Sequence, residues 1–304
     1  MCQLAGVSRA SYYRHLVEVA PDEAEMEIQA AIQEVVVANH RRYGYRRVTM
    51  ELHRRGMQVN HKRVLRIMRE DSLLAIRYRK YILTSDSEHE HEVHINLAAR
   101  MTVTGVDQLW VADITFIRLQ VKFVFLAVVI DRYSRKAIGW ALDRSLSAKV
   151  AVAALRQAIA RRPPPPGVVH HSDRGIQYAC SDYVAELKAN GMVPSMSRPA
   201  NPYDNAVCES FMKTLKQEEI RCHQYRDFQD LSEHLEEFIE TYYNRLRLHS
   251  ALGYRTPEEF ERDAAAAQAS GGAQDAAVMK YFTPKVQEKP KHRTPEAIPP
   301  TSER

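Results

Sequence analysis

The chain has 304 residues, 45% of them hydrophobic and 27% charged, with a formal net charge of +5. This length suits about two domains, and the composition is that of a globular protein. The longest apolar run, residues 123–130, is far shorter than the roughly 20 residues of a membrane-spanning helix. Arginines stand where a signal peptide has its apolar stretch, so we expect a cytoplasmic protein with no membrane partner.

The four cysteines are scattered along the chain, and no two of them form a C-x-x-C pair: Cys2, Cys180, Cys208 and Cys222. This spacing argues against a cysteine-based zinc module and against a disulfide framework. We expect reduced thiols.

The positive charge is concentrated near the N-terminus. Between His40 and Tyr81 thirteen lysines and arginines stand against three acids, a net charge of +10, which leaves −5 for the rest of the chain. A block this basic favours nucleic acid as the partner. The alternative is a solvated basic face that binds nothing.

Residues 1–20 resemble the end of a helix-turn-helix whose first part is absent, with Ser8 as a helix cap. Residues 22–81 are predicted to form a basic helical DNA-binding domain. Its first helix covers residues 22–38, a second ends at Gly56, and a third begins after Asn60. Helix, short turn and helix with basic outer faces is the shape that enters a major groove, although many such hairpins bind no DNA. The residues expected to contact DNA here are Arg46, Arg47, Lys62, Arg63 and Arg66.

Residues 82–105 lose hydrophobic periodicity and are interpreted as a linker. A second, larger domain is predicted at 106–263. Three strand-like runs at residues 110–119, 123–130 and 136–142 open it, and the second is apolar on both faces, as in a central strand.

Helices and strands then alternate along the core. Helices are predicted at about 147–162, 181–191, 204–219 and 228–245, with short strands at 168–171 and within 192–197. This order indicates an α/β fold, a mixed sheet flanked by helices. Residues 264–304 hold too few apolar residues to fold, and we expect a disordered tail.

Three carboxylates in this core are candidates for a metal site. Asp113 lies within a strand among apolar neighbours, Asp173 follows a short strand, and Glu209 lies in a helix that Asp204 or Asn205 can cap. Hard cations prefer oxygen ligands, and two Mg²⁺ ions about 4 Å apart support in-line phosphoryl displacement. One ion would activate the attacking water or 3′-hydroxyl, and the other would stabilise the leaving oxygen.

Each acid also has an ordinary structural explanation: a buried hydrogen-bonding residue, a turn residue and a surface helix acid, respectively. Asp131, at the end of the central strand, is a rival candidate that we expect instead to cap a turn. Lys213 and Lys216 follow Glu209 by four and seven positions, so the three share one helix face. This face suits a DNA phosphate backbone, or it holds an ordinary Glu–Lys pair.

The chain resembles the second-frame transposases of the insertion-sequence-three family, which share the retroviral integrase core. The resemblance covers about residues 43–260 and depends on seven motifs in order: YGYRR at 43–47, VNHKRVLRIMRE at 59–70, WVADIT at 110–115, DRYSRKAIGW at 131–140, HHSDRGIQY at 170–178, NPYDNAVCESF at 201–211 and YYNRLRLHSALGYRTPEEF at 242–260. Thirty-five residues separate Asp173 from Glu209, which is the interval of this family.

The resemblance implies an RNase H-like core with the catalytic triad Asp113, Asp173 and Glu209 and with Lys216 as a basic companion. It implies a Mg²⁺-dependent polynucleotidyl transferase with two ions, for which Mn²⁺ can substitute. It also gives Asp131 a structural role.

Such enzymes bind the terminal inverted repeats of their element, free a 3′-hydroxyl and join it to target DNA without a covalent enzyme intermediate. The resemblance further implies a bacterial, nucleoid-associated protein that forms homo-oligomers on DNA. The upstream-frame protein, or a fusion to it, is the expected protein partner.

Two other functions stay open from the sequence. One is a non-catalytic DNA-binding relic or accessory regulator of transposition, and the other is a nuclease that only hydrolyses DNA. Arg245 and His249 either touch DNA or hold the last helix to the core, and we favour the structural role. Three tyrosines are interpreted as packing residues or DNA-stacking platforms: Tyr133, Tyr178 and Tyr203.

Overall fold

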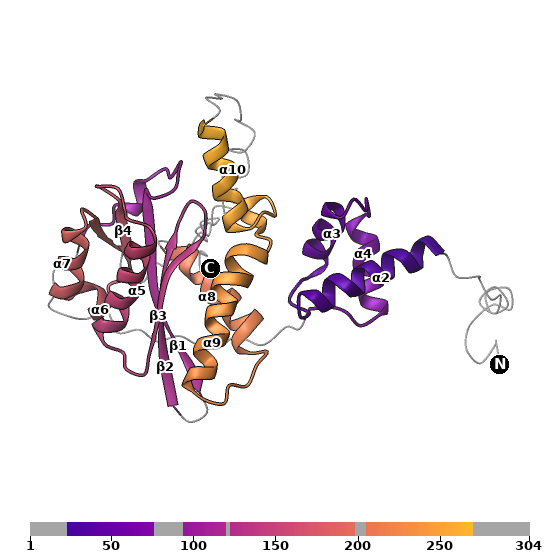
Figure 1. Cartoon of the computed structure of the whole chain (residues 1–304), viewed down its shortest axis with the longest axis horizontal. Coiled ribbons are helices and arrows are strands. Elements are labelled where there is room, and N and C mark those ends of the chain that lie inside the picture. The colour runs from indigo at the N-terminus through magenta and orange to yellow at the C-terminus, as the bar shows by residue number, and fades with distance from the viewer. Residues whose placement is uncertain (1–22, 76–93, 120–121, 198–204, 270–304) are drawn as a thin grey trace, which may run out of the picture.

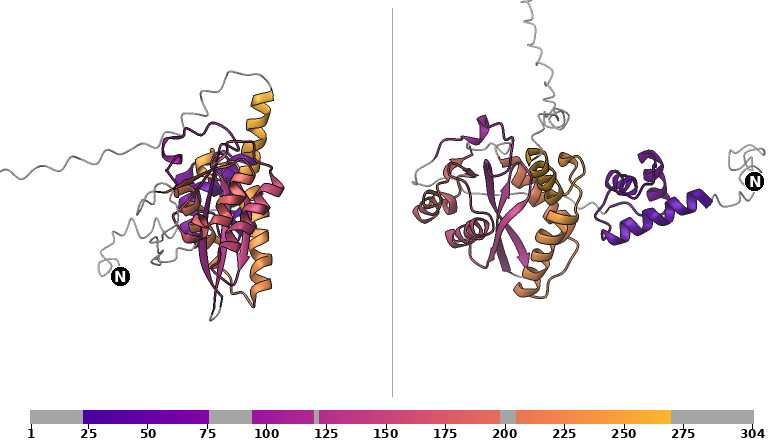
Figure 2. Two further views of the ribbon diagram at one scale, coloured as in Figure 1. Left: turned by 90° about the vertical axis from the view of Figure 1, so that its left-hand side faces the viewer. Right: turned by 45° about the horizontal axis from the view of Figure 1, so that its top comes forward.

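The structure is a computed structural model that describes residues 23–75, 94–119, 122–197 and 205–269. The predicted helix-turn-helix remnant at 1–20 and most of the predicted tail lie outside these residues. A small unit of three helices stands beside a larger α/β core (Figure 1; Figure 2, right). None of the described helices is long and apolar enough to cross a bilayer.

The N-terminal unit consists of α2 (Glu23–Ala38), α3 (Tyr45–Arg54) and α4 (His61–Glu70). Two predicted end signals are confirmed. Gly56 takes a φ of +86° just after α3, and the Asn60 side chain accepts a hydrogen bond from the Lys62 amide at the start of α4 (2.8 Å). One apolar side of each helix is buried against the others: Ile32, Val35 and Val36 from α2, Val48 and Leu52 from α3, and Val64, Ile67 and Met68 from α4. The predicted helix pair is therefore completed by α2 into a three-helix core.

The core is built on one five-stranded sheet. Its strands are β1 (Leu109–Leu119), β2 (Lys122–Asp131), β3 (Ala137–Asp143), β4 (Val169–Ser172) and β5 (Val193–Met196). Their order is β3-β2-β1-β4-β5; the first three are antiparallel neighbours, while β4 runs parallel to β1 and to β5. The predicted mixed sheet is thus confirmed.

Helices cover both faces of this sheet (Figure 1). One face carries α5 (Ala148–Arg161), α6 (Ile176–Ala179) and α7 (Ser181–Ala189), and the other carries α8 (Ala206–Leu215) and α9 (Phe228–Glu236). In β2, Val128 packs toward the second group and Val129 toward the first. The prediction of a central strand buried on both faces is confirmed.

Glycine is required where α5 crosses β3. A Cβ on Gly139 would overlap the carbonyl oxygen of Ala154 and would lie 2.7 Å from the backbone nitrogen of Ala158. The missing side chain therefore sets how closely this helix approaches the sheet.

Two predicted α-helices change type near their C-terminal ends. After α8 the chain forms a π-helix, η3 (Lys216–Ile220), and after α9 a longer one, η4 (Glu237–Leu246). Periodicity alone predicted continuous α-helices. Their widened turns carry polar groups that pair between the two segments, because Glu218 of η3 accepts a hydrogen bond from the Tyr242 hydroxyl of η4 (2.9 Å).

Two predicted boundaries also differ from the structure. The last helix, α10 (Pro257–Ala269), passes through the predicted start of the disordered tail at 264. Alanine is the best helix former, so a helix already begun continues through Ala264–Ala267 although few residues there are apolar. Within the predicted linker, a short 3₁₀ turn, η1 (Ala98–Arg100), lies against the core, where the Leu97 amide donates to the Ser195 hydroxyl (2.9 Å).

The N-terminal unit and the core meet at the loop between α2 and α3. Arg42 forms an ion pair with Glu219 (2.7 Å), and Arg47 pairs with Glu218 (3.0 Å). The Tyr43 hydroxyl donates to the Leu246 carbonyl (3.1 Å). The π-segments therefore form one part of the core side of this junction, and α10 forms another, because its Glu259 pairs with Arg54 of α3.

Candidate active site

Asp113 and Asp173 lie side by side because their strands are parallel neighbours. The last paired residues of β1 and β4 are Val111 and His171, and each acid lies two residues further along its own strand direction. Both carboxylates are anchored by the backbone: Asp113 accepts from the Ile114 amide and Asp173 from the Gly175 amide, each at 2.9 Å. Sheet register alone thus brings together two acids sixty positions apart.

Glu209 reaches this edge of the sheet on α8. The helix start is tied to β1 by Asn205, whose side-chain amide donates to the Ala112 carbonyl, one residue before Asp113 (2.9 Å). Glu209 follows one helical turn later, on an exposed position. Asn205, one of the two predicted capping residues, does occupy the N-cap position, but its side chain makes no cap hydrogen bond and binds the strand instead. The other predicted cap, Asp204, lies outside the described residues.

The electrostatics of these acids are unusual for a surface edge. Burial raises the pKa of Asp113 to about 7, and repulsion from Asp173 and Glu209 adds to this, against the Ile114 amide and Lys216. Burial also raises the pKa of Glu209. The three oxygen-bearing side chains therefore concentrate negative charge that they do not neutralise among themselves, which suits a hard divalent cation.

Two buried polar atoms beside these acids have unused hydrogen-bonding capacity. Among the described residues, neither the Tyr178 hydroxyl nor the Asn205 side-chain oxygen has a hydrogen-bond partner. Burial raises the pKa of Tyr178, with further contributions from Tyr183, Asp113 and Asp173. The Tyr178 ring packs against Tyr183 as predicted (5.2 Å between centroids), but sequence reasoning missed its hydroxyl. Orphaned polar atoms of this kind are expected where ions, water or substrate bind.

The rival acid Asp131 serves the turn that follows β2. It is fully buried and accepts hydrogen bonds from the amides of Asp107 (2.8 Å) and Ser134 (2.9 Å). Arg162 lies 3.8 Å away. The expected structural role of Asp131 is confirmed.

Three family matches cover most of the described chain. An HTH-like domain matches residues 22–81, one integrase core domain matches residues 103–202, and a second integrase core domain matches residues 190–257. The first coincides with the three-helix unit, and the other two divide the α/β core.

Two relatives match the chain over more than nine-tenths of their own length. The chain is 36% identical over 264 residues to the uncharacterized 31 kDa protein of insertion element IS600 from Shigella sonnei, which covers 86% of this chain and 97% of that protein. It is 35% identical over 266 residues to transposase InsF of insertion sequence IS3A from Escherichia coli strain K12, with 86% and 92% covered. The chain belongs to the IS3 family of transposases.

Solved structures are more distant from this transposase. A chain of the simian T-cell lymphotropic virus intasome is 16% identical, with a TM-score of 0.44, and covers 90% of this chain and 80% of that one. The catalytic core domain of BIV integrase is 19% identical, with a TM-score of 0.41, and covers 54% and 99%.

The two lysines after Glu209 occupy different surroundings in the transposase. Lys216 is half-buried over the Phe116 ring of β1, with Nζ 5.2 Å from the ring centroid. Burial lowers its pKa, although the nearby charge of Asp113 opposes this. Lys213 is exposed on α8. Lys216 therefore lies near Asp113, whereas Lys213 faces solvent.

The basic N-terminal side chains are less available than the sequence suggested. Arg63 and Arg66 both pair with Glu25 of α2, at 3.3 and 2.6 Å, and Arg47 is engaged by Glu218. Arg46 lies over the Tyr45 ring. Among the described residues Lys62 and Arg46 have no acidic partner. The N-terminal helical unit of the transposase therefore neutralises part of its own charge.

The C-terminal basic residues of the core make contacts within the core itself. His249 is buried, and its ring meets the Tyr243 ring edge-on at 4.7 Å between centroids. Arg245 pairs with Glu258 of α10 (3.3 Å). Tyr133 packs on Phe260 (5.2 Å), and Tyr203 lies outside the described residues. The structural roles favoured for Arg245 and His249 agree with these contacts.

Proposed function

We propose that this transposase catalyses metal-dependent DNA strand cleavage and strand transfer at the ends of its insertion sequence, with Asp113, Asp173 and Glu209 as the catalytic and metal-binding triad. We further propose two Mg²⁺ ions as the cofactor, for which Mn²⁺ can substitute. Family membership supports transposition as the activity and DNA as the substrate.

One observation carries the assignment to these three acids. The parallel register of β1 and β4 puts Asp113 level with Asp173, while the Asn205 hydrogen bond to Ala112 holds the Glu209 helix against the same strand. Burial raises the pKa of Asp113 to about 7, and repulsion from Asp173 and Glu209 contributes to this rise. Holding these acids near one another makes the charged form of Asp113 unfavourable. A bound cation would remove this electrostatic cost, which explains why the acids are placed together.

The metals, when bound, would polarise the phosphodiester and lower the pKa of the attacking water or 3′-hydroxyl. The three carboxylates would bind the metals and hold them in position at this edge of the sheet. Their ligand oxygens do not all lie within 4.8 Å of one another, so binding would draw exposed Glu209 toward the two aspartates. Lys216 would hold a DNA phosphate beside Asp113, and the buried Tyr178 hydroxyl would donate to an oxygen in the site.

The DNA path would run from the triad along α8 past Lys213, and the N-terminal unit would bind the terminal inverted repeats. In that unit we propose Arg46 and Lys62 as direct phosphate contacts, while Arg63 and Arg66 would exchange Glu25 for DNA. Arg47 is the least suited of the five, because it is committed to Glu218. The proposed protein partners are a second copy on DNA and the upstream-frame protein or fusion.

The test uses the purified full chain, a labelled duplex carrying the element end, target DNA, and Mg²⁺ or Mn²⁺. We expect Asp113→Asn, Asp173→Asn and Glu209→Gln each to reduce cleavage and joining by at least about 100-fold while DNA binding persists. Asp182→Asn, an exposed acid on α7, is the matched control and should retain activity.

Cleavage and joining by Asp113→Asn at the wild-type rate would contradict the proposal. Metal-independent DNA binding without strand transfer at any metal concentration would instead support a non-catalytic regulator. Cleavage that never uses a DNA 3′-hydroxyl as nucleophile would support a hydrolytic nuclease.

A further inference from the structure

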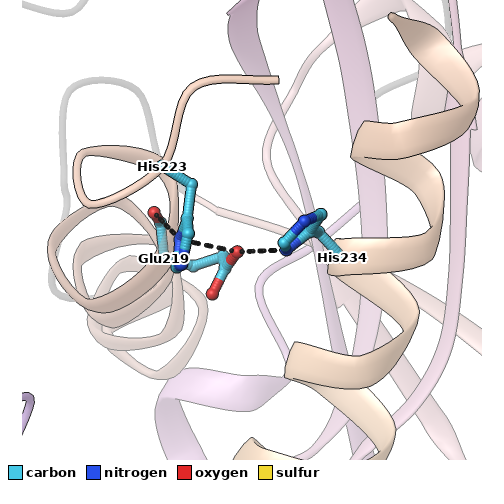
Figure 3. Close-up of side chains that lie close together, drawn as sticks. All are labelled: Glu219, His223 and His234. Atoms are coloured by element: carbon cyan, nitrogen blue, oxygen red, sulfur yellow. Dashed lines mark hydrogen bonds and ion pairs between the residues drawn. The ribbon is translucent and has the colours of Figure 1, made fainter. Parts of the chain in front are cut away.

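A second cluster of metal-ligand side chains lies away from the proposed triad. Glu219 of η3, His223 in the turn after it and His234 of α9 point toward one another (Figure 3). Each offers one ligand atom, and these atoms all lie within 4.8 Å of one another. Within the described parts of the chain, no other group of three histidine, cysteine or acidic side chains meets this criterion.

The spacing of the ligand atoms fits tetrahedral coordination. The Glu219 Oε1 atom lies 3.1 Å from His223 Nδ1 and 3.4 Å from His234 Nδ1. Zinc binds such atoms at about 2.0–2.1 Å, which in a tetrahedral site places neighbouring ligand atoms roughly 3.3 Å apart. The two imidazole rings are 5.2 Å apart and tilted by 42°, so both nitrogens reach the same carboxylate oxygen.

The carboxylate is held in place by its other partners. Arg42 binds Glu219 Oε2 (2.7 Å), and the Tyr225 hydroxyl donates to Oε1 (3.2 Å). The Glu219 side chain is 2% exposed, against 34% for His223 and 39% for His234. The site is therefore preorganised on its acidic side and open to solvent on its imidazole side.

The donor set selects the kind of metal. Arg42 already neutralises part of the Glu219 charge, so two imidazole nitrogens supply most of the remaining donor strength. Imidazole favours zinc and neighbouring transition metals, whereas magnesium and calcium need several oxygen ligands.

A hydrogen-bonded cluster without metal is the competing explanation. His223 Nδ1 also lies 3.1 Å from the Glu219 carbonyl oxygen, which suits an N–H donor at that nitrogen. Metal binding requires the other tautomer, with the proton on Nε2. Because both imidazoles are partly exposed, water can accept that proton's hydrogen bond.

We propose that Glu219, His223 and His234 form a binding site for a divalent transition metal of the zinc class, with a fourth position open to water. A metal there would join η3 to α9 directly. Through Glu219 and Arg42 it would also strengthen the junction between the core and the N-terminal helical unit.

The experiment uses the full chain carrying Asp113→Asn and Asp173→Asn, so that the proposed triad does not contribute to binding. After chelation, Zn²⁺ is titrated against a chromophoric chelator. We expect one equivalent bound per chain, and at least about tenfold weaker binding after His223→Gln with His234→Gln. The matched control, His40→Gln with His61→Gln, changes two exposed histidines outside the cluster and should bind as the parent does.

Two further measurements keep a folding defect apart from a lost site. In excess chelator the His223→Gln, His234→Gln chain should melt at the parent temperature, and Zn²⁺ should raise the melting temperature of the parent alone. Co²⁺ bound to the parent should give the intense visible absorption of four-coordinate cobalt. The proposal is overturned if the parent binds no Zn²⁺, or if the histidine pair can be replaced without weakening binding.

Discussion

Two groups of acids on neighbouring segments of the core have pKa values that are shifted in opposite directions. At the triad, burial and repulsion from Asp173 raise the pKa of Asp113 to about 7. At η3, burial would raise the pKa of Glu218, but hydrogen bonds and charge from Arg247, joined by Arg47, lower it to about 2. A buried acid is thus structural where the protein itself supplies the neutralising cation. At Asp113 the raised pKa shows no such compensation, and we propose that a metal ion supplies it.

The largest expected effect is the loss of stability when Arg247, the cation that neutralises Glu218, is removed. Arg247 is 7% exposed and binds Glu218 at 2.8 Å, so Arg247→Met would leave a buried carboxylate without its main partner. We expect the free energy of unfolding to fall by about 3–5 kcal/mol, measured by chemical denaturation. Arg245→Met is the matched control, because its pair with Glu258 is exposed and should contribute at most about 1 kcal/mol. Equal losses of unfolding free energy in the two variants would show that the buried Arg247–Glu218 pair matters no more than the exposed Arg245–Glu258 pair.

His170 extends the comparison to a buried base for which the described residues supply no acidic partner. Its Nε2 faces the Tyr183 hydroxyl (3.0 Å), and burial, with the charge of His171, lowers its pKa to about 3. In the unfolded chain the His170 imidazole binds a proton near pH 6.5, but in the folded chain it does so only near pH 3. The stability contributed by neutral His170 is therefore complete above pH 6.5 and is lost as the pH falls toward 3. Between pH 7 and pH 4 the expected fall in the free energy of unfolding is on the order of 3 kcal/mol.

The measurement is the melting temperature between pH 7 and pH 4 for wild type and for His170→Gln. The variant should show a flatter dependence, while exposed His61→Gln should follow wild type. Parallel curves for wild type and His170→Gln would show that another group controls the acid limb.

A substitution at the triad should stabilise the chain, whereas Arg247→Met should destabilise it. Asp113→Asn removes one of the repelling charges, so the metal-free chain at pH 8 should gain about 1 kcal/mol, although it loses strand transfer. Thermal unfolding in chelator measures the gain. Asp182→Asn should show no gain, because Asp182 is exposed in the first turn of α7, where a negative charge is favourable. A large loss of stability in Asp113→Asn would mean that this acid is structural, like Glu218.

The smallest effect concerns the exposed lysine on the triad helix. Lys213→Ala should lower the slope of log affinity for duplex DNA against log salt by about 0.9, the value for one phosphate contact. Lys149→Ala, exposed on α5 across the sheet, should leave the slope unchanged. An unchanged slope for Lys213→Ala would place the DNA path elsewhere.

Local patterns were sufficient for the elements that carry the site. Hydrophobic alternation and helix-end residues located the strands around Asp113 and the cap at Asn60, because both signals act over a few residues. The π-segments were missed, since a single widened turn leaves the apolar period almost unchanged. The role of Asn205 was also missed, because a helix start supplies the same residue types for capping and for binding a neighbouring strand.

The sequence by itself determined the order of the elements, the family and the three acids at their spacing, since those features are properties of short segments and of motif order. Only the tertiary structure decided which acids are neutralised. Arg42 and Arg47 reach Glu219 and Glu218 across 177 and 171 positions of chain, a distance over which no local pattern predicts contact. The same long-range packing engages Arg47, a basic side chain that the sequence had assigned to DNA. His223 and His234 reach Glu219 over only 4 and 15 positions, but no periodicity in the sequence indicated that the turn after η3 would bring α9 back against it.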